Sequence, residues 1–295
     1  MTDDTQKLLR LREMLPATGA GIYLATATRG PLPAETAAAM READDWELRV
    51  GRVWDGRAED VLQREEEARA VVAALIAADP DEVTLTRGLE DARGLARAVI
   101  DAGGVVIDAT ARVGAVAVDV KALGATAVYF AADRWLLGPE STGAMWTGDR
   151  GAAAPKASRE LPRTALIGLA RSIGWLEMYV GLEWIYERTA RLATQLYDHL
   201  ATTPGVKVLT PREQLGASLS FRIENWKADE AAEELSRRVN ALVGQEPNLN
   251  AVVASVAWFN TEQELDRFAA AVSEIARFTP ATIPRRPSLV VLTDS

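Results

Sequence analysis

The sequence has no cysteine, and its 295 residues include a single histidine. Without cysteine there is no disulfide, no thiolate nucleophile and no cysteine-ligated metal. The histidine, His199, lies in a helical pattern, so neither a Ser-His-Asp triad nor a histidine-rich metal site is expected. The composition therefore excludes several common catalytic arrangements and predicts no metal site.

Long apolar runs and excess positive charge are also lacking. No apolar run reaches the length of a membrane span, and residues 1–14 are charged, without the apolar core of a signal peptide. The 33 basic and 42 acidic residues give a net charge of -9, which argues against nucleic-acid backbones and anionic membranes as partners. We therefore expect a cytoplasmic protein that binds neither nucleic acid nor membrane.

What the sequence does contain is an alternation of short apolar strands with helical segments. The composition, 48% hydrophobic and 25% charged, is that of an ordinary globular protein. Buried-type strands alternating with helices favour an α/β class with a mainly parallel sheet. The strands are expected at 83–86, 105–108, 126–131 and 143–148.

The last third of the chain changes character, because its strands are short and alternate between apolar and polar residues. Strands are expected at 206–210, 218–223 and 252–258, with helices over 227–243 and 261–278. This pattern predicts a smaller α+β unit. We expect an N-terminal segment, 1–33, that packs with the C-terminal domain, a large α/β domain over 34–160, and linking helices with the small domain over 161–295.

The order of these segments carries a resemblance to a known family. A strand that ends in Asp108 is followed by GAVAVDVKALGA, a second strand, DRWLLGPESTGAMW and, near the end, WFNTEQELDRF. The chain resembles the class V aminotransferase family of fold-type I pyridoxal-phosphate (PLP) enzymes, in particular its cysteine desulfurase, selenocysteine lyase and isopenicillin N epimerase-like branch. The resemblance implies a truncated PLP-transferase-like large α/β domain, with a reduced and mainly parallel sheet, plus a smaller C-terminal α+β domain.

The resemblance also places the lysine that attaches PLP covalently at Arg134. A guanidinium stays protonated and has no amine that can form this bond. Asp133 and Ala132 stand where the family commonly has His or Gln and a phosphate-binding Ser. The segment keeps the family's scaffold and lacks its covalent chemistry.

Other positions that the family uses for PLP and substrate are also replaced. Leu89 and Glu90 stand where small hydroxyl residues bind the phosphate, and a carboxylate at a helix N-terminus repels a phosphate. Asp108 matches the carboxylate that pairs with the pyridine nitrogen. The family's Gln, substrate-binding Arg and N-terminal Asn correspond to Ala111, Val253 and Ala25.

A gap accompanies these replacements. Between the helix that ends near Ile100 and the strand at 105, where the family has several tens of residues, this chain has only DAGG. The strands that remain correspond to neighbours in the family's sheet, so they can still pair. We therefore predict that 105–108 is an edge strand, covered by a helix, a loop or a partner subunit.

Two hypotheses about function follow. In the first, the chain is a pseudoenzyme with no expected cofactor that acts as a binding, scaffolding or regulatory subunit. In the second, it remains an enzyme that binds PLP non-covalently, or that uses the cleft where the family binds PLP for another reaction on a small anionic, amino-acid-like substrate. Arg87, Arg112 and Arg134 would then bind the anion, beside Glu90, with Asp108 or Asp133 as the base.

The alternative for each charged residue is a structural role in a surface or loop salt bridge, without ligand binding. Arg134, for example, could pair with Asp108 and Glu90. As partners we expect a second copy in a homodimer, or a full-length aminotransferase-like subunit in a heterodimer, because fold-type I proteins usually dimerise. Trp46 and Trp54 lie in a charged, loop-like segment and are the best interface candidates among the tryptophans.

Overall fold

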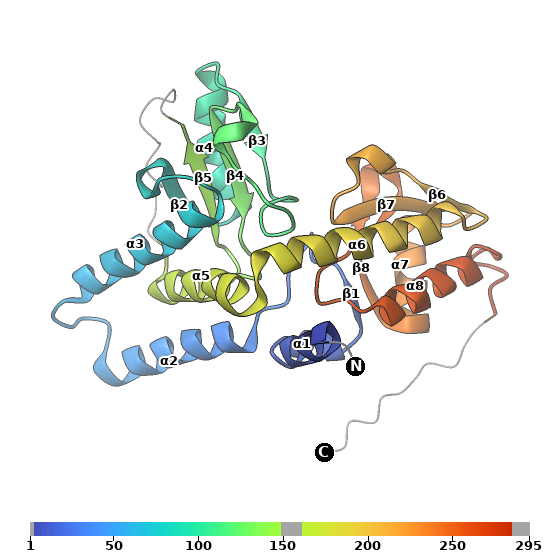
Figure 1. Cartoon of the computed structure of the whole chain (residues 1–295), viewed down its shortest axis with the longest axis horizontal. Helices are drawn as coiled ribbons and strands as arrows, with labels where there is room; N and C mark the ends of the chain where they lie inside the picture. Colours follow the sequence, from blue (N-terminus) through green and yellow to red (C-terminus); the bar gives the residue numbers. More distant parts are fainter. Residues whose placement is uncertain (1–2, 149–160, 285–295) are drawn as a thin grey trace. The chain divides into compact units, whose positions relative to one another are not determined.

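The structure is a computed structural model that describes residues 3–148 and 161–284 (Figure 1). The chain divides into two compact units: unit 1 is Met1–Ala17 with Thr26–Thr189, and unit 2 is Thr18–Ala25 with Ala190–Ser295. This division differs from the expected boundaries at 33 and 160. Residues 22–24 join the sheet of unit 2 as a strand, whereas the helix that begins at Arg163 packs in unit 1.

Unit 1 contains a four-stranded sheet with the order β2-β5-β4-β3. β2, β3 and β4 run in one direction and β5 runs in the opposite direction, so the β3–β4 pair is a parallel ladder and the other two pairs are antiparallel. This mixed α/β sheet confirms the predicted fold class and the predicted strand positions. The strands are β2 (Val83–Thr86), β3 (Val106–Asp108), β4 (Ala127–Ala131) and β5 (Gly143–Thr147).

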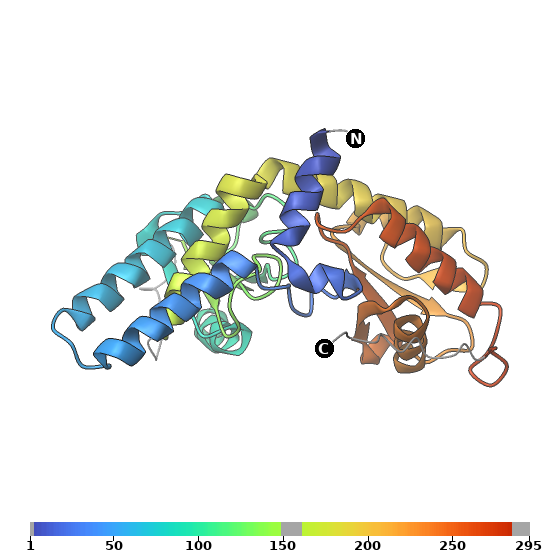
Figure 2. The ribbon, with the colours of Figure 1, turned by 90° about the horizontal axis from the view of Figure 1, so that it is seen from below.

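The helices of unit 1 pack on this sheet and on one another. α4 packs against β4, and α2 and α3 both pack against α5 (Figures 1 and 2). The segment 44–60, expected to be loop with some helix, is helical at both of its ends. The helices are α1 (Asp3–Glu13), α2 (Ala34–Val50), α3 (Arg57–Leu75), α4 (Leu89–Asp101) and α5 (Arg163–Trp175); a π-helical turn (Leu176–Val180) and α6 (Leu182–Ala201), which continues into unit 2, follow.

In the described ranges no single helix has both the length and the hydropathy of a membrane span. One pair, Arg163–Val180 with Leu182–Ala201, meets the criteria together but is bent by 81°.

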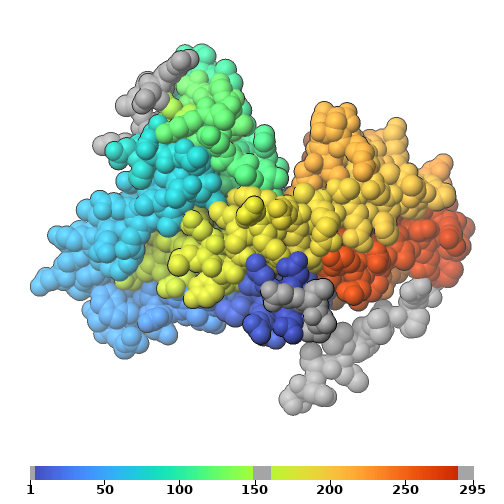
Figure 3. Space-filling view, viewed as in Figure 1, coloured from blue at the N-terminus to red at the C-terminus, as the bar shows by residue number. Residues whose placement is uncertain are grey.

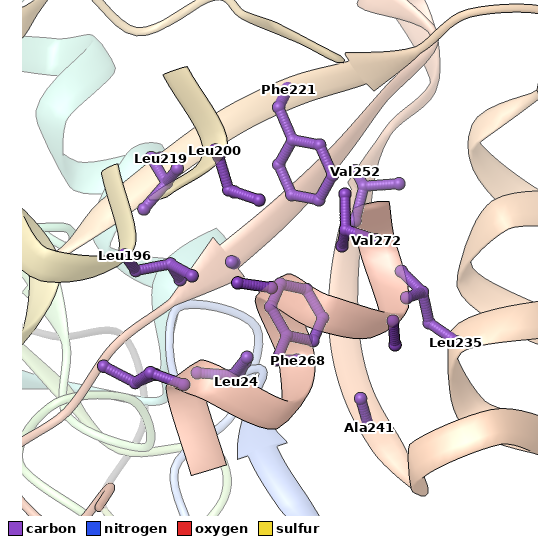
Figure 4. Packing of buried hydrophobic residues seen from close by; sticks show 14 of the residues in the cluster. Leu24, Leu196, Leu200, Leu219, Phe221, Leu235, Ala241, Val252, Phe268 and Val272 are labelled. Atoms are coloured by element: carbon purple, nitrogen blue, oxygen red, sulfur yellow. The ribbon is translucent and has the colours of Figure 1, made fainter. Parts of the chain in front are cut away.

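Unit 2 is a five-stranded sheet with the order β1-β8-β9-β7-β6, packed against α7, α8 and the part of α6 that lies in unit 2. β1 pairs with β8 in parallel, and the remaining pairs are antiparallel. Its apolar core includes Phe221, Phe268 and Leu235, which converge between the sheet and the helices (Figure 4). The elements are β1 (Ile22–Leu24), β6 (Val206–Val208), β7 (Ser218–Ile223), α7 (Ala228–Val239), β8 (Ala241–Glu246), β9 (Ala251–Ser255) and α8 (Glu262–Ile275).

One predicted helix of unit 2 is corrected by the structure. The helix expected over 227–243 ends at Val239, and the last residues of that range begin strand β8. Asn240 causes the change, because it adopts the left-handed conformation (φ 54°) that commonly ends a helix. Its backbone N–H still donates to the carbonyl of Ser236 at 2.9 Å, and the chain then turns into the sheet.

Strand β3 lies at the edge of the unit 1 sheet, as predicted. The expected cover is incomplete within the described residues, because Val105 is 60% exposed and Asp108 is exposed. The apolar strand is therefore protected mainly by its short length, which is one way in which proteins blunt a sheet edge.

Candidate ligand site

Because β2, β3 and β4 run in one direction, they end at the same edge of the unit 1 sheet. In open α/β sheets ligands bind outside the carboxyl ends of the strands. We call this side of the sheet the carboxyl-end edge, and it is the candidate site. The segments at this edge carry all the predicted cleft residues: Arg87 and Glu90 after β2, Asp108 and Arg112 at and after β3, and Asp133 and Arg134 after β4.

Asp108 is the last residue of β3, and its carboxylate is engaged by neighbouring groups. Its Oδ1 accepts a hydrogen bond from the backbone N–H of Thr110 at 3.0 Å. Its Oδ2 lies 3.7 Å from Nη2 of Arg93, whose Nη1 donates to Glu90 at 2.8 Å. Asp108 and Glu90 are therefore linked through Arg93 on α4, and neither is paired with Arg134.

Tyr129 of β4 completes this cluster, because it lies opposite Asp108 in the β3–β4 ladder. Burial raises the pKa of Tyr129, the hydrogen bond from Arg93 lowers it, and the nearby Asp108 carboxylate raises it. The hydrogen bond to Tyr129 in turn raises the pKa of Arg93. The phenol is thus held protonated between a cation and a carboxylate.

Arg134 lies in a tight turn after β4 whose backbone is fixed on both sides. The carbonyl of Asp133 accepts from Gly30 N–H at 2.9 Å, and that of Arg134 accepts from Leu137 N–H at 3.1 Å. The hydroxyl of Ser172 on α5 donates to the carbonyl of Leu137 at 2.7 Å. Since Trp135 and Leu136 are buried, the turn holds the side chain of Arg134 at a fixed point of the carboxyl-end edge.

Asp133 is mostly buried, with 15% of its side chain exposed. Burial raises the pKa of this carboxyl, and the nearby Arg29 and Arg134 guanidinium groups partly offset the effect. Arg29 Nε lies 3.8 Å from Asp133 Oδ2, and Arg29 also hydrogen-bonds to Glu140. A carboxyl that holds its proton more tightly than usual therefore lies next to two cations.

The three predicted anion-binding arginines lack ion-pair partners among residues 3–148 and 161–284. Arg87 and Arg112 are exposed and Arg134 is half-buried, and none of the three guanidinium groups makes an ion pair or hydrogen bond to a described residue. The structural salt bridges expected as the alternative to anion binding are therefore not seen for these three side chains. A half-buried guanidinium without a partner, such as that of Arg134, is suited to an external anion.

The N-terminus of α4 is shielded from anions by its own acidic residues. Gly88 precedes the helix with φ 82°, a conformation that favours glycine, and packs against Ser141. Asp91 Oδ2 accepts from the backbone N–H of Arg87 at 2.9 Å, and Glu90 lies in the same turn. This end of the helix does not fit a phosphate.

Neither lysine that the structure describes in unit 1 lies at the candidate site. Lys121 Nζ lies 2.7 Å from Asp79 and 3.3 Å from Glu82, and these partners precede β2 at the opposite edge of the sheet. Lys7 lies over the ring of Trp184. The remaining lysine of this part of the sequence, Lys156, lies outside the described residues.

The other positions assigned through the resemblance carry no polar side chain. Ala111 is exposed after β3, and Ala132 is buried after β4. In unit 2, Val253 lies within β9 and Ala25 forms a bridge with Ser255. The side chains at these four positions are apolar, so they offer no charge or hydrogen-bonding group to a ligand.

Three residues of the site lie outside the set predicted from the sequence: Arg93, Tyr129 and Arg29. Arg93 could have been found because it lies three residues after Glu90 on one helix face. Tyr129 is the one polar-tipped residue in the apolar strand AVYFA. The role of Arg29 depends on a contact across more than a hundred residues, which no local pattern shows.

No family model matches the sequence, and no curated protein matches it. Solved structures do match over most of their own length. A lysine-to-alanine mutant of C-DES, described with glycine covalently linked to its PLP cofactor, matches with a TM-score of 0.76 and 12% identity, over 89% of this chain and 99% of that one. A cysteine desulfurase from Thermococcus onnurineus NA1 matches with a TM-score of 0.75 and 17% identity, over 91% and 98%.

The cysteine desulfurase CsdA from Escherichia coli also matches, with a TM-score of 0.70 and 18% identity, over 92% of this chain and 98% of that one. The chain therefore has the fold of the fold-type I PLP enzymes. This is the fold of the cysteine desulfurase structures above, as the resemblance in sequence implied. The expectation that no cofactor goes with this chain is corrected here, because the matching C-DES structure carries PLP.

Whether the described residues fit PLP depends on how it would be held. They do not fit attachment through a lysine after β4, since Arg134 occupies that turn. They do fit a non-covalent mode: the half-exposed carboxylate of Asp108 suits a pyridinium nitrogen, and the unpartnered guanidinium of Arg134 suits a phosphate. Two groups compete for the Asp108 carboxylate: the backbone N–H of Thr110 at Oδ1 and the guanidinium of Arg93 at Oδ2.

Proposed function

We propose that this protein binds PLP, or a closely similar phosphate-bearing aromatic anion, without a covalent link, and that it acts as a binding or regulatory subunit. The observation that carries the proposal is Arg134, a half-buried cation in the turn after β4 whose guanidinium makes no ion pair or hydrogen bond with a described residue. A guanidinium can hold an oxyanion with two parallel hydrogen bonds, and it cannot act as the attaching amine. When bound, PLP supplies an electrophilic aldehyde and an electron-withdrawing ring.

One solved neighbour supports binding of PLP in a chain that has lost a lysine. The C-DES mutant has an alanine in place of a lysine and still contains PLP, linked to glycine. In the present chain Asp108 would pair with the ring nitrogen, and the buried turn would hold Arg134 against the phosphate. These residues bind and orient the ligand, and no catalytic step is assigned to them.

The test is a titration of the purified full-length chain with PLP, followed by ligand depletion in equilibrium dialysis. Arg134→Ala should weaken binding about tenfold or more, because a charge-assisted hydrogen bond contributes about 1.5–3 kcal/mol and 1.4 kcal/mol is a tenfold change. Arg97→Ala is the matched control, since among the described residues Arg97 pairs with Asp101 alone, on its own helix. If the wild type does not bind PLP, or if both variants bind it equally well, the proposal is wrong.

Reduction with borohydride tests the non-covalent mode separately. The wild type should yield no pyridoxyl-lysine in mass analysis, although five lysines are present in the sequence. Arg134→Lys places an amine in the turn, and this variant should yield an adduct at position 134. An adduct on a lysine of the wild type would contradict non-covalent binding.

A second candidate function is turnover of a small anionic, amino-acid-like substrate. Asp133 favours it, because burial raises the pKa of this carboxyl beside the cationic Arg134, and a general base is more effective when its pKa approaches the working pH. Activity that Asp133→Asn abolishes, and that Glu140→Gln leaves intact, would support this function. Both functions are compatible with a dimer and with a location in the cytoplasm, which we also propose.

A further inference from the structure

Helix α5 packs against the turn that carries Arg134, and one buried hydroxyl of the helix contacts the backbone of that turn. Ser172 is fully buried, and its Oγ lies 2.9 Å from the carbonyl oxygen of Leu136 and 2.7 Å from that of Leu137. We propose that Ser172 is a positioning residue for the anion site, because its hydroxyl fixes the turn and thereby sets the affinity of Arg134 for a phosphate. This inference rests on the proposed function, since it concerns the same guanidinium.

The turn needs support from outside, because Leu137 has a backbone conformation that a residue with a Cβ adopts only with strain. Its φ is 53°, in the left-handed region. Strained residues of this kind persist only where the surrounding structure fixes them, and they gather at functional sites. The Leu137 N–H donates to the carbonyl of Arg134 at 3.1 Å, so a relaxation of Leu137 would move Arg134 directly.

Ser172 supplies the donor for the two carbonyls of this strained segment. Leu136 and Leu137 are both buried, and among the described residues no other group donates to their carbonyl oxygens. A serine inside a helix commonly bonds a carbonyl of its own preceding turn, whereas the hydroxyl of Ser172 is directed at a different segment of the chain. Removing this hydroxyl would leave buried carbonyls without a donor, which is unfavourable unless the turn moves.

A second residue on the same face of α5 allows the helix to approach the turn closely. Gly168 lies one helical turn before Ser172, so the two residues share a face. A Cβ at Gly168 would lie 2.5 Å from Cγ of Pro139 and 2.7 Å from Sδ of Met40. The missing side chain at Gly168 therefore sets how near α5 lies to the segment after the turn, and Ser172 holds the segment at that distance.

Helix α5 is itself held from two sides within unit 1. Figure 3 shows it in yellow-green between the light-blue α3 and the darker blue α2, and both of these helices pack against it. Arg163 Nε donates to Asp60 of α3 at 2.5 Å, and Arg171 Nη1 donates to Glu35 of α2 at 3.2 Å. Because α5 is anchored near both of its ends, the hydroxyl of Ser172 can hold the turn in one position.

The first experiment measures the PLP affinity of the full chain by equilibrium dialysis. Ser172→Ala should raise the dissociation constant about fivefold, which corresponds to about 1 kcal/mol, the usual net contribution of one hydrogen bond. Thr36→Val is the matched control, since Thr36 is also buried in unit 1 and its hydroxyl has no hydrogen-bond partner among the described residues. This control should bind PLP as the wild type does.

A double-mutant cycle with Arg134→Ala separates positioning from a general loss of structure. If Ser172 acts through Arg134, Ser172→Ala should have almost no further effect on PLP affinity once residue 134 is alanine. A loss of affinity that is equal in both backgrounds, or no loss in either, would overturn the inference and leave the proposed function intact. A wild type that does not bind PLP would overturn the proposed function and, with it, the role of Ser172 in affinity.

Hydrogen exchange tests the positioning without any ligand. In Ser172→Ala the amide of Leu137, which bonds the carbonyl of Arg134, should exchange about fivefold faster, and Gly168→Ala should also speed it. Gly174→Ala is the control on the same helix, because a Cβ at Gly174 meets open space. An exchange rate of Leu137 that Ser172→Ala leaves unchanged would show that Ser172 does not hold the turn, whether or not PLP binds.

Discussion

Arg93 of α4 links two carboxylates that the sequence had assigned separately, since its Nη1 lies 2.8 Å from Glu90 and its Nη2 lies 3.7 Å from Asp108. The helix after β2 is therefore tied to the end of β3 by one guanidinium. The same side chain hydrogen-bonds Tyr129. The carboxyl-end edge is thus organised around a residue that lies outside the predicted set.

Replacing Arg93 should change the titration of Tyr129. The hydrogen bond from Arg93 lowers the pKa of Tyr129 and Asp108 raises it, so Arg93→Ala should raise this pKa further. Titration followed by NMR of the tyrosine ring signals measures the shift. Arg97→Ala removes a guanidinium one turn along the same helix and should leave Tyr129 unchanged.

The same variant bears on ligand binding. Arg93 competes for Asp108, and a half-exposed ion pair contributes only about 0.2–1 kcal/mol. Arg93→Ala should therefore strengthen PLP binding by no more than about fivefold. Weaker binding in this variant would show that Arg93 contacts the ligand rather than competing with it.

Gly30 should be intolerant of any side chain. A Cβ at this position would lie 2.0 Å from the carbonyl oxygen of Arg134 and 2.6 Å from Leu137, so Gly30→Ala must displace the turn after β4. We expect a loss of about 1–3 kcal/mol in the free energy of unfolding, measured with urea. Gly94→Ala is the control, because its Cβ meets open space within α4, and it should stabilise by up to about 1 kcal/mol.

Asp133 should make the protein less stable as the pH rises. Burial raises its pKa above the value near 3.9 of the unfolded chain, so the folded state retains the proton over a range where the unfolded state has lost it. The favourable contribution is fully present below the unfolded pKa and is lost as the pH rises through the folded pKa. Asp133→Asn should remove this dependence of the free energy of unfolding on pH, measured with urea at a series of pH values. Glu140→Gln, which removes the other carboxylate that pairs with Arg29, should retain it.

Asp60 should show the opposite dependence on pH. The hydrogen bond from Arg163 lowers the pKa of Asp60, and Arg64 lowers it further against the cost of burial. The stabilisation is therefore present above the unfolded pKa and is lost as the pH falls through the folded pKa. Asp60→Asn should cost about 1–3 kcal/mol at neutral pH, and Asp101→Asn, in an exposed pair with Arg97, should cost less than about 0.5 kcal/mol.

The sequence was sufficient for the strands of unit 1 but not for the start of β8. Apolar runs bounded by glycine and charged residues predicted β2, β3, β4 and β5 within one or two residues, because buried strands have a strong local pattern. The helix that should have continued to 243 instead ends at Val239, before the left-handed Asn240. The residues that follow it, Ala241 and Leu242, fit a helix as well as a strand, and only pairing with β1 decides between them.

The site was predicted by position and not by contacts. The structure places the predicted arginines and carboxylates at or after the ends of β2, β3 and β4, at one edge of the sheet. The pairing of Arg93 with Asp108 and of Arg29 with Asp133 depends on the distance between elements. A local sequence pattern does not show which side chains of distant segments come into contact, so these partners could be identified only from the structure.

Strand β1 has a consequence for how the protein is made. Ile22 pairs with Ala241, so the strand leaves the ribosome long before its neighbour exists. At about 5–20 residues per second, the intervening stretch of about 220 residues takes on the order of 10–40 seconds to synthesise. During that time the nascent chain carries this apolar strand unpaired, and we expect the closure of the unit 2 sheet to be a late event in biosynthesis.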